Sequence, residues 1–243
     1  MKYIGIDGCK VGWFLIGLEE DGSGSFGILD KISELSECLS TVELVLLDIP
    51  IGLRQEHNDE RLCDKKARTV LQPKRGSSVF PAPSRCALES ESYEEASERN
   101  RVCTGRKLTK QTFAIIPKIR EVDNFLRSEK GRDKIHEMHP EVCFWALNNR
   151  RPMNHKKKSA EGYEERMSVL ARYYPNSRGI VDMAMQHYKR AEVARDDIVD
   201  ALVGAVTARN AMQLLSFPDT PEIDEMGLPM EIVYWAPENN VAG

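Results

Sequence analysis

The stretch that decides the fold is Met1–Gly17, which reads MKYIGIDGCKVGWFLIG. An apolar run over Tyr3–Ile6 predicts a buried strand, and Asp7 follows at the point where this run ends. Two glycines then permit a tight turn, and the apolar residues 13–16 can return beside the first strand as a hairpin. Asp7 is therefore expected at the edge of a sheet, although an Asp-Gly pair can also serve only to hydrogen-bond its own turn.

Two further strands are expected to end in an acid. A continuous Val/Leu run over residues 42–48 is typical of a strand buried on both faces, and Asp48 closes it just before Pro50. A short strand over residues 135–138 leads through His139 and Pro140 to Glu141. Two other strands are expected, one that completes the N-terminal meander and one at an edge near the end of the chain, at residues 26–29 and 230–235.

Apolar residues at helical spacing predict several helices, and we expect one domain over residues 1–243 with a helical insertion at about 55–132. Pro117 is expected to start a new helix. Residues 72–85 form a loop rich in Pro, Gly and Ser, and loops of this length are often functional. The expected helices cover residues 31–39, 58–71, 89–98, 109–125, 141–147, 163–173, 181–188 and 196–215.

Composition narrows the function classes. The chain has 243 residues, 30% of them charged, and a net charge of -4, which argues against binding nucleic acid through bulk positive charge. With no signal peptide and no run of about 18 apolar residues, we expect a cytoplasmic protein. Its six cysteines, without a Cys-x-x-Cys pair, are expected to be thiols, and the five histidines show no zinc-binding spacing.

The last helix carries a pair of acids. Asp197 and Asp200 are three residues apart and share one face near the helix start, whereas Asp196 is expected to cap it. Acids at a helix start are also favoured by the helix dipole. Asp200, however, lies beside Ala201 and Ala205 on the face expected to pack on the sheet, where a carboxylate without a partner would be costly. A partner cation would remove that cost.

These acids suggest a metal site. If the carboxylates of the strand ends and the last helix converge, they repel one another and their pKa values rise unless a cation is present. Oxygen ligands without a nearby set of His or Cys suit Mg²⁺ or Mn²⁺. Two such ions can activate water and stabilise the leaving oxygen of a phosphodiester. The candidate catalytic residues are Asp7, Asp48, Glu141, Asp197 and Asp200.

Several motifs resemble known families. The hairpin at Asp7, the buried strand ending at Asp48 and the helix DDIVDALVGAVTA resemble the RNase H-like fold, and the helix looks like the last helix of RuvC-type Holliday junction resolvases. The chain also resembles, over nearly its whole length, the family catalogued as domain of unknown function 429, described as predicted RNase H-fold nucleases. The motifs that carry this second resemblance are GIDGCKVGW, DIPIGL, CDKKAR, SSVFPAPSR, PKIREVD, HPEVCF, KKKSAEGYEERM and DDIVDA.

The resemblance implies an α/β fold with a mixed five-stranded sheet flanked by helices, and a nuclease that acts with Mg²⁺ or Mn²⁺ on nucleic acid or a small phosphodiester. It implies Asp7, Asp48, Asp197 and Asp200 as metal ligands, while Glu141 is hypothesised to be an extra ligand or a general base. Lys and Arg near a phosphodiester would bind its charge. The candidate substrate contacts are Arg75, Ser77, Ser78, Arg85, Lys118, Glu121 and Lys157, with the basic stretch 150–158 as a further candidate.

Two other function classes stay open. The first strand and its glycine turn also resemble the phosphate-binding hairpin of sugar-kinase and actin-like ATPases, but those proteins need a second such hairpin, and the chain shows no internal repeat. The alternative is a non-catalytic binding module whose acids hold a structural metal. In that case loss of the Asp7 carboxylate would unfold the protein instead of only inactivating it.

Overall fold

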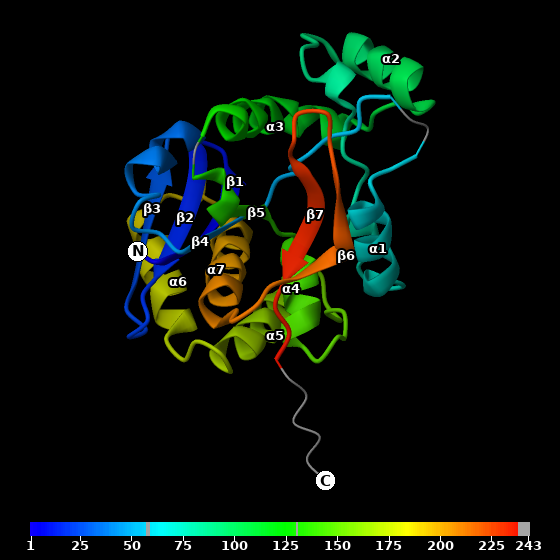
Figure 1. Ribbon diagram of the computed structural model, residues 1–243. Coiled ribbons are helices and arrows are strands. Elements are labelled where there is room, and N and C mark those ends of the chain that lie inside the picture. The colour runs from blue at the N-terminus through cyan, green and yellow to red at the C-terminus, as the bar shows by residue number, and fades with distance from the viewer. Residues whose placement is uncertain (57–58, 130, 238–243) are drawn as a thin grey trace.

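The computed structural model describes residues 1–56, 59–129 and 131–237. At its centre is a five-stranded mixed sheet of order β3-β2-β1-β4-β5 (Figure 1). The first three strands form an antiparallel meander, and β4 and β5 run parallel to β1. The predicted mixed α/β sheet is therefore confirmed. Its strands are β1 (Tyr3–Cys9), β2 (Gly12–Leu18), β3 (Gly24–Leu29), β4 (Leu44–Leu47) and β5 (Ile135–Glu137).

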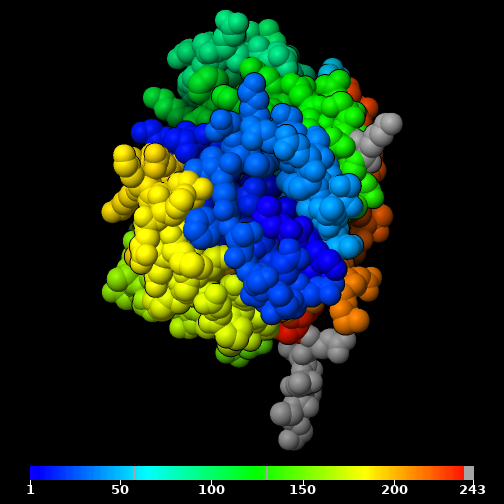
Figure 2. All heavy atoms as spheres, turned by 90° about the vertical axis from the view of Figure 1, so that its left-hand side faces the viewer, coloured from blue at the N-terminus to red at the C-terminus, as the bar shows by residue number. Residues whose placement is uncertain are grey.

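The described residues form seven α-helices, five of which cover the two faces of the main sheet. The helix α3 covers one face together with the short 3-10 helix Ile32–Glu37, and α4 to α7 cover the other. In Figure 2, the N-terminal meander fills the middle of one side of the molecule, beside the yellow residues of α6. The helices are α1 (Leu62–Leu71), α2 (Tyr93–Thr104), α3 (Lys110–Ser128), α4 (Pro140–Leu147), α5 (Ala160–Ala171), α6 (Ser177–His187) and α7 (Arg195–Asn210).

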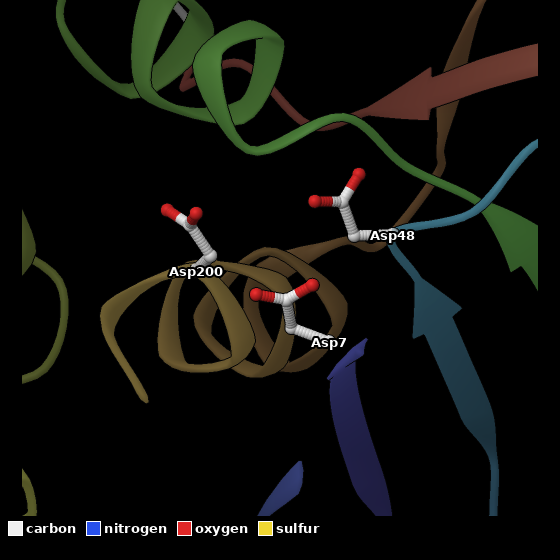
Figure 3. Close-up of side chains that lie close together, drawn as sticks. All are labelled: Asp7, Asp48 and Asp200. Carbon is white, nitrogen blue, oxygen red and sulfur yellow. The ribbon is translucent and has the colours of Figure 1, made fainter. Parts of the chain in front are cut away.

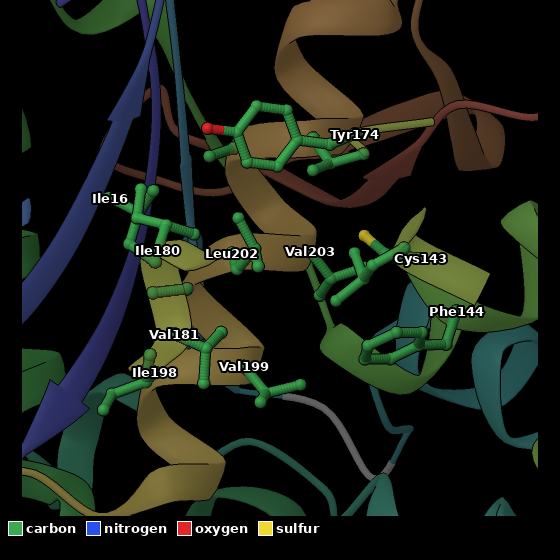
Figure 4. Packing of buried hydrophobic residues seen from close by; sticks show 14 of the residues in the cluster. Ile16, Cys143, Phe144, Tyr174, Ile180, Val181, Ile198, Val199, Leu202 and Val203 are labelled. Carbon is green, nitrogen blue, oxygen red and sulfur yellow. The ribbon is translucent and has the colours of Figure 1, made fainter. Parts of the chain in front are cut away.

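Side chains alternate between the two faces of the sheet, as strand geometry requires. Ile4 and Ile6 pack into the core on the α3 side, so Gly5 between them faces α7. In the neighbouring strand, Leu46 packs into the core on the α7 side and Val45 into the opposite one. Figure 4 shows the α7-side core, where α7, α6 and α4 pack together.

The close approach of α7 to β1 depends on glycine. A Cβ placed on Gly5 would lie 2.1 Å from the carbonyl oxygen of Ala201 and 2.2 Å from the amide nitrogen of Ala205. A Cβ on Gly204 would in turn lie 3.1 Å from the Cα of Gly5. The helix and strand backbones are thus in direct contact, and the expectation that Ala201 and Ala205 face the sheet is confirmed.

A second, two-stranded sheet was not expected. It pairs β6 (Leu215–Ile223) with β7 (Pro229–Tyr234) and packs against α1 and α4. The predicted terminal strand exists, but its antiparallel partner is β6, and only one bridge, from Met138 to Val233, links it to the end of β5. Pro218 lies inside β6, where an edge strand tolerates proline.

Three other local predictions are wrong. The last helix ends at Asn210 instead of residue 215. Pro117 lies inside a continuous α3 and does not start a new helix. The proline removes only one helical hydrogen bond, and buried residues on both sides of it pack on the sheet. Cys86 and Cys103 form a disulfide between the loop before α2 and the end of α2, so these two cysteines are not thiols.

Other boundaries shift by a few residues. The expected start of the first long helix at residue 58 lies outside the described residues, and α1 begins at Leu62. Three helices, α1, α2 and α3, fall within the span 55–132 that was expected to be an α-rich insertion. Within the described parts of the chain, no helix combines the length and the apolar character needed to span a membrane.

Candidate metal centre

The register of β1 and β4 brings Asp7 and Asp48 together. The last paired residues of these parallel strands are Ile6 and Leu47, and the N–H of Asp48 donates to the Ile6 carbonyl over 2.9 Å. The next residue of each strand is an aspartate. Asp7 was expected at the end of its strand, but β1 continues to Cys9 through its pairing with β2, so Asp7 lies inside β1.

Both aspartates lie on the α7-facing side of the sheet, because Asp7 is two residues after Gly5 and Asp48 is two residues after Leu46, and both of these positions face α7. Asp200 lies in the second turn of α7, next to the residues that touch Gly5. One carboxylate oxygen of each of Asp7, Asp48 and Asp200 lies within 4.8 Å of the other two (Figure 3). Asp7 is 9% exposed and Asp200 2%, whereas Asp48 is half-buried.

Crowding and burial favour the protonated carboxyl groups. Burial, and then the charges of Asp48 and Asp200, raise the pKa of Asp7 well above its ordinary value. Burial and the charge of Asp200 do the same to the pKa of Asp48. Burial raises the pKa of Asp200 to about 6, although Lys157 opposes the rise.

Lys157 supplies one positive charge to the group. Its Nζ lies 2.5 Å from Oδ2 of Asp200 and 3.7 Å from Oδ2 of Asp196. Burial lowers the pKa of Lys157, but Asp200, Asp7 and Asp48 raise it by more, so that it lies above its ordinary value. When all three carboxylates are ionised, as binding of a cation requires, the single ammonium leaves two of their negative charges uncompensated. The donor set therefore fits a divalent cation with a preference for oxygen ligands.

Two of the expected site acids lie outside this three-carboxylate group. Asp197 accepts a hydrogen bond of 3.0 Å from the N–H of Ala194 and so caps the start of α7. The predicted cap was Asp196, but α7 begins at Arg195, one residue earlier than expected. Glu141 forms a buried ion pair with Arg166 through Oε1. Its Oε2 is buried and has no hydrogen-bond partner among the described residues.

A cavity of about 560 Å³ opens over the carboxylates. Asp7, Asp48 and Asp200 contribute to its lining, and so does Glu141. Gly8 also lines the cavity and faces the flexible end of the Lys118 side chain, which forms part of the wall. The five candidate substrate contacts that also line the cavity are Arg75, Ser77, Ser78, Lys118 and Lys157.

Arg85 was expected to contact substrate, but its guanidinium is held inside the protein. It forms ion pairs with Asp123 over 2.7 Å and with the buried Asp224, and it does not line this cavity. Glu121 is also occupied within the fold: its two oxygens accept hydrogen bonds from the Trp13 indole over 3.2 Å and from the Ile32 N–H over 2.6 Å. These contacts anchor the covering helices.

A buried ion network beside the cavity was missed. Arg61 pairs with Asp64 over 2.6 Å and with Glu137 over 2.7 Å, and it donates to the carbonyls of Ile51 and Gly52. Burial raises the pKa of Glu137 to about 7, and Arg61 opposes that rise. Charged residues three apart on a polar helix look like a solvated face in sequence. The signal for a role of Glu137 is its pairing with Leu47, the residue before Asp48, and this pairing depends on the register of the strands.

A known protein family matches most of the chain. A sequence model described as "Protein of unknown function (DUF429)" matches residues 5–223. The chain belongs to this family. The DUF429 match includes all three clustered aspartates, so the candidate metal centre lies within the part of the chain that defines membership. No curated protein and no solved structure matched the chain.

Proposed function

We propose that this DUF429 protein is a divalent-metal-dependent phosphodiesterase, a hydrolase of the nuclease type that the sequence suggested. The observation that carries the proposal is the convergence of three aspartate oxygens within 4.8 Å at the floor of a cavity. The surplus negative charge supports a Mg²⁺ or Mn²⁺ ion held by Asp7, Asp48 and Asp200. Such an ion, when bound, polarises a phosphoryl oxygen and lowers the pKa of water.

The chain's own groups have separate tasks in this reaction. Lys157, half-buried beside Asp200, can leave its ion pair when a cation arrives and then hold a phosphoryl oxygen. The oxygen of water bonds to phosphorus, one ester P–O bond breaks, and the products are a phosphomonoester and an alcohol. Glu141, which lines the cavity, can accept one proton of the attacking water, and the departing ester oxygen takes up one proton from solvent to become the alcohol.

Substitution of the clustered acids tests the proposal. Asp7→Asn and Asp200→Asn keep the side-chain shape but remove a charge, so we expect Mn²⁺ affinity in calorimetry to fall about 100-fold. Hydrolysis of bis(p-nitrophenyl) phosphate should fall with it. Asp182→Asn, on an exposed position of α6 outside the cavity, is the matched control and should change neither.

The same experiment distinguishes a metal-dependent hydrolase from a non-catalytic binding module. Asp197→Asn should change Mn²⁺ affinity much less than Asp7→Asn, since Asp197 caps the helix. The stoichiometry of the titration reports whether one or two ions bind. Undiminished hydrolysis by Asp7→Asn would refute the mechanism, and metal binding without hydrolysis of any phosphodiester would favour a binding module.

A further inference from the structure

The cavity over the metal centre has the dimensions of a small-molecule site. Its volume of about 560 Å³ lies in the range typical of pockets for small ligands, and its walls come from separate parts of the chain. The loop after α1 forms one wall through Ser77 and Phe80, and α3 forms another through Gln111 and Ile115. The clustered aspartates belong to the lining, so a phosphodiester that contacts them occupies the cavity.

The charged side chains of the lining do not form a continuous positive surface that could bind a long polyanion. Six carboxylates and five cationic side chains line the cavity. Four of these cations are held by the protein: Arg61 by Asp64 and Glu137, Lys157 by Asp200, Arg75 by the carbonyls of Met153 and Asn154, and Lys118 by the carbonyl of Gly12. Continuous duplex binding needs many free Lys or Arg side chains along the phosphates.

One part of the lining is apolar and suits a flat ring. Phe80 is half-buried, and it is the one phenylalanine, tyrosine or tryptophan among the described residues that line the cavity. Other apolar residues of the same lining are Ile49, Pro50, Val79 and Ile115. A partly exposed aromatic ring beside a phosphate site is the arrangement on which nucleobases stack.

Resting on the proposed function, we infer that the cavity binds one nucleotide unit, with its base against Phe80 and its phosphodiester over Asp7, Asp48 and Asp200. The unit can come from a small nucleotide diester or from the end of a single strand, because both present the same chemistry. The interior of an uninterrupted strand or duplex is excluded, since its neighbouring nucleotides cannot enter the cavity together.

The first test is a set of substrates given to the full chain with Mn²⁺. The thymidine 5′-(p-nitrophenyl) phosphate ester should be hydrolysed, and closed circular single-stranded and duplex DNA should stay closed. Shortening of a linear single strand from one end would identify strand ends as the source, and an intact linear strand would identify small diesters. Opening of the circles at a rate similar to hydrolysis of the ester, and lost in Asp7→Asn, would overturn the inference while leaving the proposed function in place.

The second test isolates the base. Phe80→Ala should raise KM for the thymidine ester about tenfold with little change in kcat, and it should leave methyl p-nitrophenyl phosphate, which has no base, unaffected. Phe80→Trp should restore the low KM. Phe113→Ala, a half-buried ring of α3 outside the cavity, is the control and should not change KM. An equal effect of Phe80→Ala on both esters would contradict base stacking.

A binding measurement keeps the inference testable if no ester is hydrolysed, a result that would refute the proposed function. Thymidine 5′-monophosphate should then still bind more tightly than inorganic phosphate, and Phe80→Ala should remove the difference. Equal affinity of the wild-type chain for the two ligands would overturn the nucleotide site as well.

Discussion

Asp7 shows how one residue serves both structure and chemistry. Its Oδ1 accepts a hydrogen bond of 2.7 Å from the N–H of Gly8, the local role open to any Asp-Gly pair. The same carboxyl group also lies against two other acids in a buried position, where its charged form is disfavoured. A local turn contact does not require such crowding, so the cluster reflects the arrangement of three distant segments.

The raised pKa of Asp7 predicts how stability depends on pH when no metal is bound. Between the ordinary value of 3.8 and the raised folded value, the native state binds more protons than the unfolded state, so the free energy of unfolding falls as pH rises. Asp7→Asn removes this term. In EDTA, we expect the variant to gain stability relative to wild type as pH rises above about 4, measured by urea unfolding. A difference that is constant with pH would contradict the assignment.

Lys157 and a metal ion should compete for Asp200. Lys157→Met removes the ammonium 2.5 Å from that carboxylate, so metal-free stability should fall by about 2 kcal/mol. Divalent-ion affinity should rise about tenfold, because a cation beside the ligands has been removed. Calorimetry with Mg²⁺ checks the affinity, and urea unfolding checks the stability. Lys158→Met, at an exposed neighbour 3.8 Å from Asp196, is the control and should change both quantities little. Weaker metal binding in Lys157→Met would indicate that Lys157 supports the ion.

The contact between β1 and α7 holds the strand acids and the helix acid together. Gly5 allows the helix backbone to lie on the strand, and this places Asp200 over the end of β4. At the other end of the site, the buried Arg61 network joins α1 to the end of β5 and to the turn after Asp48. The three clustered aspartates of the candidate metal centre are therefore held by elements from both halves of the chain.

Gly5→Ala should separate helix and strand. Since its Cβ would lie 2.1 Å from a backbone oxygen, we expect a loss of about 3 kcal/mol or more and weaker Mn²⁺ binding. Gly27→Ala is a matched strand control, because a Cβ there meets nothing within 4 Å, and its effect should stay within about 1 kcal/mol. Thermal unfolding and calorimetry measure both variants. Equal stability of the two would show that α7 can shift without cost.

Arg61→Met should destabilise the protein through the acids it leaves behind. Removal of one partner from a buried ion network typically costs about 3–5 kcal/mol, because Asp64 and Glu137 lose their counter-ion. Arg99→Ala breaks an exposed ion pair with Glu95 in α2 and should cost less than about 1 kcal/mol. Urea unfolding at neutral pH compares them. A cost for Arg61→Met no larger than that of the control would show that the network adds little to stability.

Across the whole molecule, charge is distributed in a way that limits contact with polyanions. The net charge is -4, and Arg61, Arg85 and Arg166 are each paired with an acid of the fold. The basic stretch 150–158 contains the exposed Lys156 and Lys158, but Lys157 is paired with Asp200. The site therefore has few cations to offer a long nucleic acid.

Binding of a single-stranded oligonucleotide should accordingly depend weakly on salt. With two to three phosphate contacts, the slope of log affinity against log salt should be about -2 in fluorescence anisotropy. Replacing Lys156, Lys157 and Lys158 together by Ala should flatten this slope. A slope near -7 that the triple variant leaves unchanged would show that another surface binds the strand.

The sequence alone determined the framework of this protein. Short apolar runs bounded by glycines and the Val/Leu run predicted strands of the main sheet, and the small residues of the last helix predicted the face that packs on it. The motifs resembled the family that the chain matches. Asp7 and Asp48 were identified as acids at the ends of predicted strands, and Asp200 as an acid on the packed face of the last helix, where a carboxylate without a partner is costly. These features are local, so they can be read from neighbouring residues.

The tertiary structure decided what depends on contacts between distant residues. It separated Asp197, which caps its own helix, from the three clustered acids, and it paired Arg85 with Asp123 and Asp224 inside the fold. It also revealed β6 and the Arg61 network, which have no distinctive local pattern. A charged side chain has the same sequence signature whether solvent, a substrate or a buried acid balances its charge; only its neighbours in space distinguish these cases.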